Sequence, residues 1–155
     1  ALSSFTGLPH RMQLVAEVGG VTYYDDSKAT NVGAALRAIE GLDRRAVLIA
    51  GGREKGGPYA PLREAIRARI KRIVLIGEAR ANMTAQLGDV VPCDEAETLE
   101  EAVRLAARAA EPGEAVLLAP ACASWDMFRD YGERGDRFAA AARATGAPQG
   151  ATDGR

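Results

Sequence analysis

The side chains best suited to chemistry stand together at positions 25–31, in the order Asp-Asp-Ser-Lys-Ala-Thr-Asn. The preceding residues 21–24 predict a strand, and Val32, Leu36 and Ile39 recur at the spacing of one helix face. Such a strand-to-helix turn presents unpaired backbone N–H groups and the positive end of the helix dipole. The segment is therefore typical of an anion-binding site.

A purely structural role for this turn is the alternative interpretation. Ser27 or Thr30 alone could serve as the N-cap of the following helix. A cap does not require two carboxylates, an ammonium and an amide beside it, so we favour a binding function.

Two further loops carry unusual residues, and each follows a short apolar run. Residues 51–58 are rich in glycine and follow residues 46–50, whereas residues 120–125 follow residues 115–119. Wholly apolar runs of this length are typical of strands that are buried on both faces of a parallel sheet. Loops at the carboxyl ends of such strands line the ligand crevice. These two loops and residues 25–31 therefore predict one composite site for a small anion that carries a carboxylate or phosphates.

The remaining pattern alternates strands and helices, which predicts an α/β domain with a mainly parallel sheet and helices on both faces. Residues 12–18 and 21–24 flank Gly19 and Gly20, so they predict a hairpin and one antiparallel strand in a sheet of about six. The other expected strands are residues 46–50, 73–76, 90–91 and 115–119. The expected helices are residues 32–40, 62–70 and 79–87, one that Thr98 opens and Pro112 closes, and a broken helix from Trp125 to Ala144.

Composition excludes several classes of protein. The 155 residues suit one domain, and the 47% hydrophobic content supports a core. The net charge of -1 and the 5% of aromatic residues argue against binding to nucleic acid or to a membrane surface. The sequence shows no signal peptide and no apolar run of membrane-spanning length. Cys93 and Cys122 lack the spacing of a metal or redox pair, and with a single His the chain offers no zinc set.

Common catalytic motifs do not fit. Gly51 and Gly56 satisfy the glycine spacing of a P-loop, but Gly and Pro follow where Lys and Ser or Thr are required. Ser124 lacks the context of a hydrolase nucleophile, and His10 is distant in the sequence. Ser124 could cap the last helix and also offer its hydroxyl to a ligand. Lys55 could be a solvated turn residue or a point charge for a ligand carboxylate.

Four motifs occur here in one order: Gly-Leu-Pro-His-Arg at residues 7–11, Asp-Ser-Lys-Ala-Thr-Asn at 26–31, Gly51-Gly52 with Lys55, and Pro-Ala-Cys-Ala-Ser at 120–124. With these motifs the chain resembles the C-terminal domain of the Mur ligase family, in its D-glutamate-adding branch. Other branches and folylpolyglutamate synthase share the domain plan but differ in the second motif. The resemblance implies a Rossmann-like three-layer domain at residues 10–145. Residues 1–9 have no strong period and are expected to be a linker, and the Gly, Ala, Pro and polar residues at 146–155 predict a disordered tail.

The resemblance also implies a cytoplasmic, ATP- and magnesium-dependent amide ligase of peptidoglycan precursor synthesis. Such an enzyme adds D-glutamate to UDP-N-acetylmuramoyl-L-alanine through an acyl phosphate. In the family the UDP substrate sits on a first domain, and the P-loop and magnesium ligands sit on a second. Because those motifs are missing here, we expect this chain to be part of a longer enzyme, to hold no metal ligand and to be inactive alone. We also expect that enzyme to be a monomer.

By the same resemblance, three residues would contact the nucleotide. Arg11 and Lys28 would meet its phosphates, and Asp26 would meet a ribose hydroxyl. Beyond the positioning of substrates by Lys28 and Lys55, no catalytic group is expected in this domain.

The remaining site residues are assigned to D-glutamate. Thr30, Lys55 and Ser124 would hold its carboxylates, and Trp125 and Tyr131 would line its pocket. A related ligase for another acidic amino acid, and a non-catalytic domain that binds a small anion, are the alternatives.

Overall fold

The computed structural model describes residues 10–54, 57–124 and 127–146, which form a six-stranded sheet in the order β1-β2-β6-β3-β4-β5. The strands are β1 (Gln13–Val18), β2 (Val21–Asp25), β3 (Ala46–Gly51), β4 (Ile70–Ile76), β5 (Cys93–Glu95) and β6 (Ala115–Leu118). β1 pairs antiparallel with β2, and the other neighbouring pairs are parallel. The predicted mainly parallel sheet with one antiparallel strand is confirmed.

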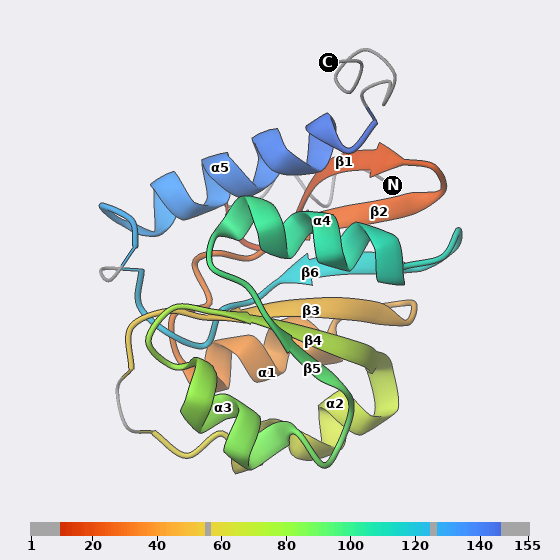
Figure 1. Ribbon diagram of the computed structural model, residues 1–155. Helices are drawn as coiled ribbons and strands as arrows, with labels where there is room; N and C mark the ends of the chain where they lie inside the picture. Colours follow the sequence, from red (N-terminus) through yellow and green to blue (C-terminus); the bar gives the residue numbers. More distant parts are fainter. Residues whose placement is uncertain (1–9, 55–56, 125–126, 147–155) are drawn as a thin grey trace.

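Helices cover both faces of this sheet, so the fold has three layers (Figure 1). They are α1 (Val32–Glu40), α2 (Arg63–Arg69) after a short 3-10 turn η2 (Ala60–Leu62), α3 (Arg80–Leu87), α4 (Leu99–Ala109) and α5 (Tyr131–Ala144). Alternate strand residues point to opposite faces. Leu48 and Leu117 are buried with α1, α2 and α3, whereas Val47 and Val116 are buried with α4 and α5. None of the helices in the described ranges is long and apolar enough to cross a membrane.

The predicted hairpin is present between β1 and β2. Gly19 and Gly20 have φ values of 62° and 84°, and Val18 pairs with Val21 across the turn. A two-residue hairpin turn with positive φ at both positions is accessible mainly to glycine, which explains this pair.

Two predicted element boundaries are wrong. Ile70 was expected at the end of a helix, but α2 ends at Arg69 and Ile70 is extended, fully buried and paired with Ala46. Its side chain is buried in the apolar core on the face of the sheet that α1, α2 and α3 cover. The weak strand expected at residues 90–91 lies instead at β5, where Cys93 pairs with Ile73.

The caps considered as structural alternatives for Ser27, Thr30 and Ser124 are not formed. Neither Ser27 nor Thr30 caps α1: the side chain of Asn31 accepts a hydrogen bond from the Ala34 N–H. Ser124 does not cap α5 either, because Asp130 is extended and accepts from Glu133, and the described residues 127–130 lie outside any helix. Several polar residues near a helix start could each serve as its cap. The backbone conformation decides which of them does, and the sequence pattern does not reveal that conformation.

The topology explains how three distant loops can form one site. β2, β6 and β3 are adjacent and parallel, so their carboxyl ends lie at one edge of the sheet, on the left in Figure 1. The described parts of the loops at residues 25–31, 51–58 and 120–125 leave the sheet there.

Candidate functional site

Backbone hydrogen bonds join the three loops directly. The N–H of Ala121 donates to the carbonyl oxygen of Ala29 at 2.9 Å, and the N–H of Gly51 donates to that of Pro120 at 2.9 Å. The predicted juxtaposition of these loops is therefore confirmed, and the hydrogen bonds that join them use main-chain groups, whose N–H donors only a substitution by proline removes.

Arg134 ties two of the loops to α5. Its side chain is fully buried, and Nη2 donates to the carbonyl oxygens of Ser27 and Cys122, each at 3.1 Å. Hydrogen bonds from a charged donor are stronger than neutral ones, and a buried guanidinium requires them. The sequence does not indicate a role for this residue, because an Arg in a helix with alternating charges gives no signal of burial.

Gly135 allows α5 to approach the first loop closely. A Cβ atom at this position would lie 2.5 Å from Asp25 Oδ2 and from Ser27 Oγ, and also against His10 Nδ1. Real Cβ atoms do not make such contacts, so glycine is required for this packing.

A hydrogen bond between His10 and Asp25 fixes the segment that carries Arg11. His10 Nδ1 lies 2.7 Å from Asp25 Oδ2, and the His10 carbonyl oxygen accepts from the Lys28 N–H at 3.0 Å. His10 and Met12, on either side of Arg11, have φ values of 65° and 44°. Non-glycine residues adopt such values only where surrounding contacts hold them. His10 thus anchors this turn to β2.

A cleft of about 280 Å³ contains the residues assigned to the nucleotide. It is lined by Arg11, Met12, Asp26, Lys28, Ala29, Ala34, Arg37 and Ala38. The structure thus brings Arg11, Asp26 and Lys28 together. It adds Arg37, an exposed residue in the last turn of α1 that the sequence analysis missed. Its place near the end of a helix that begins at the loop is the signal that could have found it.

The carboxyl group of Asp26 lies at the wall of this cleft and is almost completely buried. Burial, and then the neighbouring charge of Asp25, raise its pKa to about 7 against the opposing effect of Arg11 and Arg37. Near neutral pH this group can therefore exist in either form, and it can accept or donate a hydrogen bond to a hydroxyl group.

The residues assigned to D-glutamate are placed only in part. Ser124 is buried, and its carbonyl oxygen accepts from the Phe128 N–H at 2.8 Å. The Thr30 N–H donates to the carbonyl oxygen of Lys28 at 2.8 Å, so Thr30 follows Lys28 in a tight turn. Lys55 and Trp125 lie outside the described residues.

Tyr131 is the first residue of α5, and it lies against a residue of the other group. The Lys28 ammonium donates to the Tyr131 hydroxyl at 3.1 Å and lies 4.9 Å from the ring centroid. This contact joins the residues assigned to the nucleotide with those assigned to the amino acid.

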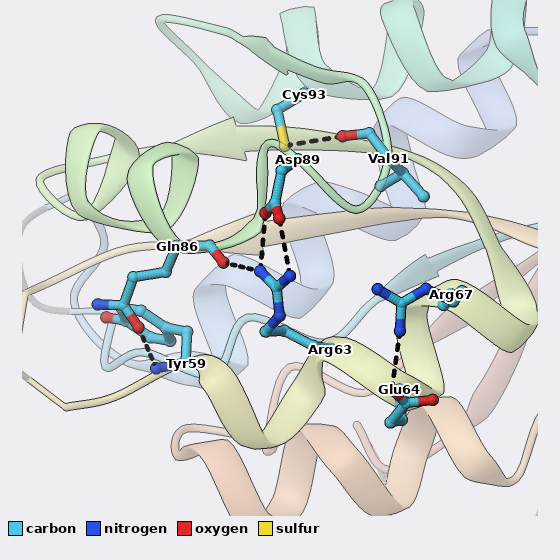
Figure 2. Close-up of polar contacts among 8 residues, drawn as sticks. All are labelled: Tyr59, Arg63, Glu64, Arg67, Gln86, Asp89, Val91 and Cys93. Atoms are coloured by element: carbon cyan, nitrogen blue, oxygen red, sulfur yellow. Dashed lines mark hydrogen bonds and ion pairs between the residues drawn. The ribbon is translucent and has the colours of Figure 1, made fainter.

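The basic residues of α2 are not among those that line the cleft. One of them, Arg63, makes structural contacts with the end of α3 and the turn after it (Figure 2). Arg63 forms two hydrogen bonds with the Asp89 carboxylate, at 2.7 and 2.8 Å, and a third with the Gln86 carbonyl oxygen at 2.7 Å. Among the described residues, Arg67 bonds only to Glu64, which lies in its own helix. Arg63 thus joins α2 to the C-terminal end of α3 and to the turn after it.

Metal ligands are not gathered in the part of the chain that the structure describes. No group of three or more His, Cys, Asp or Glu side chains there could hold a metal ion. Cys122 is buried, and its sulfur lies 3.5 Å from the Tyr59 hydroxyl.

The chain thus forms a three-layer α/β domain. At the carboxyl ends of its strands lies a cleft lined by three cations and one carboxylate. The family model of the Mur ligase, glutamate ligase domain, matches residues 10–122. The chain therefore belongs to the Mur ligase family.

A curated relative supports this assignment, and two solved structures share the fold. The UDP-N-acetylmuramoylalanine–D-glutamate ligase of Geotalea daltonii is 54% identical over 144 residues, which make up 93% of this chain and 32% of that protein. The chain thus spans about a third of the length of the curated relatives it matches. The murein peptide ligase of Psychrobacter arcticus has a TM-score of 0.61 and 18% identity, over 91% of this chain and 31% of that one. The MurF ligase of Thermotoga maritima, in complex with ADP, has a TM-score of 0.58 and 14% identity, over 88% and 31%.

Proposed function

We propose that this chain is the C-terminal domain of a cytoplasmic ligase that joins D-glutamate to UDP-N-acetylmuramoyl-L-alanine at the expense of ATP. The domain comprises residues 10–145, and residues 1–9 link it to a preceding domain. The observation that carries the proposal is the cleft at the carboxyl edge, where Arg11, Lys28 and Asp26 line one volume of about 280 Å³. Family membership and the relatives named for D-glutamate ligation support the choice of substrate.

In this proposal the cleft receives part of the nucleotide. Arg11 and Lys28 bind phosphate oxygens, because a guanidinium and an ammonium are the side chains suited to them. Asp26 bonds a ribose hydroxyl. The ADP bound to the MurF ligase of Thermotoga maritima, which shares the fold, supports a nucleotide as the ligand. Magnesium accompanies the ATP, and its protein ligands belong to another domain of the enzyme.

The second half of the site holds the amino acid. Thr30, Lys55 and Ser124 bind the two carboxylates of D-glutamate, and Trp125 and Tyr131 form its walls. Each charge-assisted hydrogen bond contributes about 1.5–3 kcal/mol, so two or three of them can select an acidic amino acid. The domain positions the amine for attack on an acyl phosphate formed by ATP on the alanine carboxylate.

An assay of the full-length protein that carries this sequence tests the proposal. Phosphate release is measured with ATP, magnesium, UDP-N-acetylmuramoyl-L-alanine and one amino acid at a time: D-glutamate, L-glutamate, D-aspartate or D-alanine. Of the four amino acids, we expect only D-glutamate to support turnover. The isolated 155-residue chain should show no turnover with any of them. Preference for another amino acid would assign the chain to a different ligase, and binding without turnover by the full protein would indicate a non-catalytic role.

Two matched substitutions connect the assay to the cleft. Lys28→Ala should lower kcat/KM for ATP by about tenfold or more, since it removes a phosphate contact. Arg67→Ala removes an exposed cation of α2 outside the cleft and should leave the rate unchanged.

A further inference from the structure

Lys28 makes two contacts with the same aromatic residue. Its Nζ donates to the Tyr131 hydroxyl at 3.1 Å and lies 4.9 Å from the centre of the ring. A cation within about 6 Å of an aromatic face is attracted to it. In the described ranges, Lys28 Nζ makes no other hydrogen bond or ion pair, so Tyr131 determines where this ammonium lies.

Tyr131 is itself held in place by its surroundings. Asp130 caps α5 directly before it and accepts from the Glu133 N–H at 2.9 Å. The Tyr131 ring meets the His10 ring edge-on, with 6.0 Å between centroids and an interplanar angle of 78°. His10 is fixed by its hydrogen bond to Asp25 at 2.7 Å. The tyrosine is therefore a preformed support and not a mobile surface residue.

We propose that Tyr131 is a positioning residue for Lys28: its hydroxyl and ring hold the ammonium where it meets the nucleotide phosphates. This inference rests on the proposed function, in which Lys28 binds phosphate, and it gives Tyr131 a role beyond lining the amino-acid pocket. Lys has four rotatable bonds and many rotamers, which a ligand must otherwise restrict on binding. Restricting them beforehand favours binding because less conformational entropy is then lost.

The position of Tyr131 also connects the two halves of the site. The same side chain borders the proposed pocket for D-glutamate and fixes a cation of the nucleotide cleft. A substitution that removes only the Tyr131 hydroxyl should therefore impair the use of ATP, although the sequence analysis assigned this residue to the pocket for D-glutamate.

A double-mutant cycle in the full-length enzyme tests this inference. Tyr131→Phe, Lys28→Ala and the double variant are compared with wild type for kcat, KM for ATP and KM for D-glutamate. We expect Tyr131→Phe to lower kcat/KM for ATP by about three- to tenfold, since one hydrogen bond to a charged group is lost. The KM for D-glutamate should change less than about twofold, because the ring remains. In the Lys28→Ala background, Tyr131→Phe should have no further effect.

Tyr23→Phe is the matched control. It removes a hydroxyl that lies 3.4 Å from Thr145 Oγ1, away from the cleft, and should leave all three constants unchanged. Thermal unfolding of both Phe variants separates a loss of folded protein from a specific effect.

Each contrary result overturns a definite statement. If Lys28→Ala impairs the use of ATP but Tyr131→Phe does not, the positioning role is wrong and the proposed function stands. If Tyr131→Phe acts equally with and without Lys28, or raises only the KM for D-glutamate, the tyrosine serves the amino-acid pocket alone. If Lys28→Ala leaves kcat/KM for ATP unchanged, the nucleotide role of Lys28 fails, and the positioning role fails with it.

Discussion

The Nδ1 atom of His10 lies 2.7 Å from Oδ2 of Asp25, a carboxylate that is only 1% exposed at the end of β2. The other oxygen of Asp25 accepts from the Ser27 N–H at 2.8 Å. One buried carboxylate therefore holds both the segment before β1 and the loop after β2. Arg11 and Lys28, the two cations proposed to bind phosphate, lie one on each of these segments.

Replacing His10 should therefore destabilise the fold. His10→Ala leaves the Asp25 carboxylate buried with one hydrogen bond fewer, and we expect a loss of about 1.5–3 kcal/mol in the free energy of unfolding. Urea denaturation of the chain measures it. Gln13→Ala, which removes only the side chain that accepts from the His10 N–H, is the control and should cost about 1 kcal/mol or less. An equal decrease in the free energy of unfolding in the two variants would show that the hydrogen bond between His10 and Asp25 does not stabilise the fold more than the hydrogen bond from the His10 N–H to Gln13.

Two glycines of α5 should respond oppositely to the same substitution. A Cβ at Gly135 would overlap Asp25 Oδ2 and Ser27 Oγ, so Gly135→Ala should destabilise the fold by about 2 kcal/mol or more. At Gly132 the nearest atom would be Asp130 Oδ1 at 3.3 Å, and Ala favours the helix, so Gly132→Ala should be neutral or stabilise by up to about 1 kcal/mol. Thermal unfolding compares the variants, and a well-tolerated Gly135→Ala would contradict the close packing of α5 on the first loop.

The sequence was sufficient to predict the sheet and the edge at which the loops meet. Short apolar runs and the Gly19-Gly20 turn are local signals, and the order of strands and helices restricts the topology. The assignment of Ile70 to a helix failed because an isolated apolar residue fits both periods, and only its pairing with Ala46 decides between them.

The contacts that complete the site could not be predicted in the same way. Arg134 and Tyr131 lie more than a hundred positions after the loop residues Ser27 and Lys28 that they contact. Whether they reach that loop depends on how α5 packs across the sheet, and this packing depends on Gly135. The sequence around a residue of a helix does not show whether its side chain makes such a distant contact.

The two parallel hydrogen bonds from Arg63 to the Asp89 carboxylate should control the pKa of that carboxyl group. Hydrogen bonds from Arg63 lower the pKa of Asp89 to about 2, so the ion pair stabilises the fold above pH 3.8 and this contribution is lost as pH falls through about 2. Arg63→Lys keeps the charge but not the two parallel hydrogen bonds, so the pKa of Asp89 should rise toward 3.8. Carboxylate ¹³C NMR titration measures it. Arg67→Lys, on the same helix, should leave the value near 2.

Asp26 should make the chain less stable as the solution becomes less acidic. Its pKa is about 7 in the fold, because of burial and then the charge of Asp25, against 3.8 for an unperturbed carboxyl group. Between these two values the folded chain retains a proton that the unfolded chain has lost, so stability falls as pH rises from about 4 to about 7 and is then constant. Asp26→Asn cannot lose a proton there. It should therefore be more stable than wild type at pH 8 by roughly 1–3 kcal/mol, and the difference should vanish near pH 4.

Urea denaturation of Asp26→Asn across this pH range separates a binding role from a structural one. Glu64→Gln, an exposed carboxylate on α2, should shift stability by no more than about 0.5 kcal/mol at every pH. A buried carboxylate that destabilises the fold at neutral pH is retained only where it has another use, and we assign that use to the ribose hydroxyl. Asp26→Asn should therefore gain stability while kcat/KM for ATP in the full-length enzyme falls by about tenfold. A variant that is more stable and equally active would leave the carboxylate without a function in the cleft.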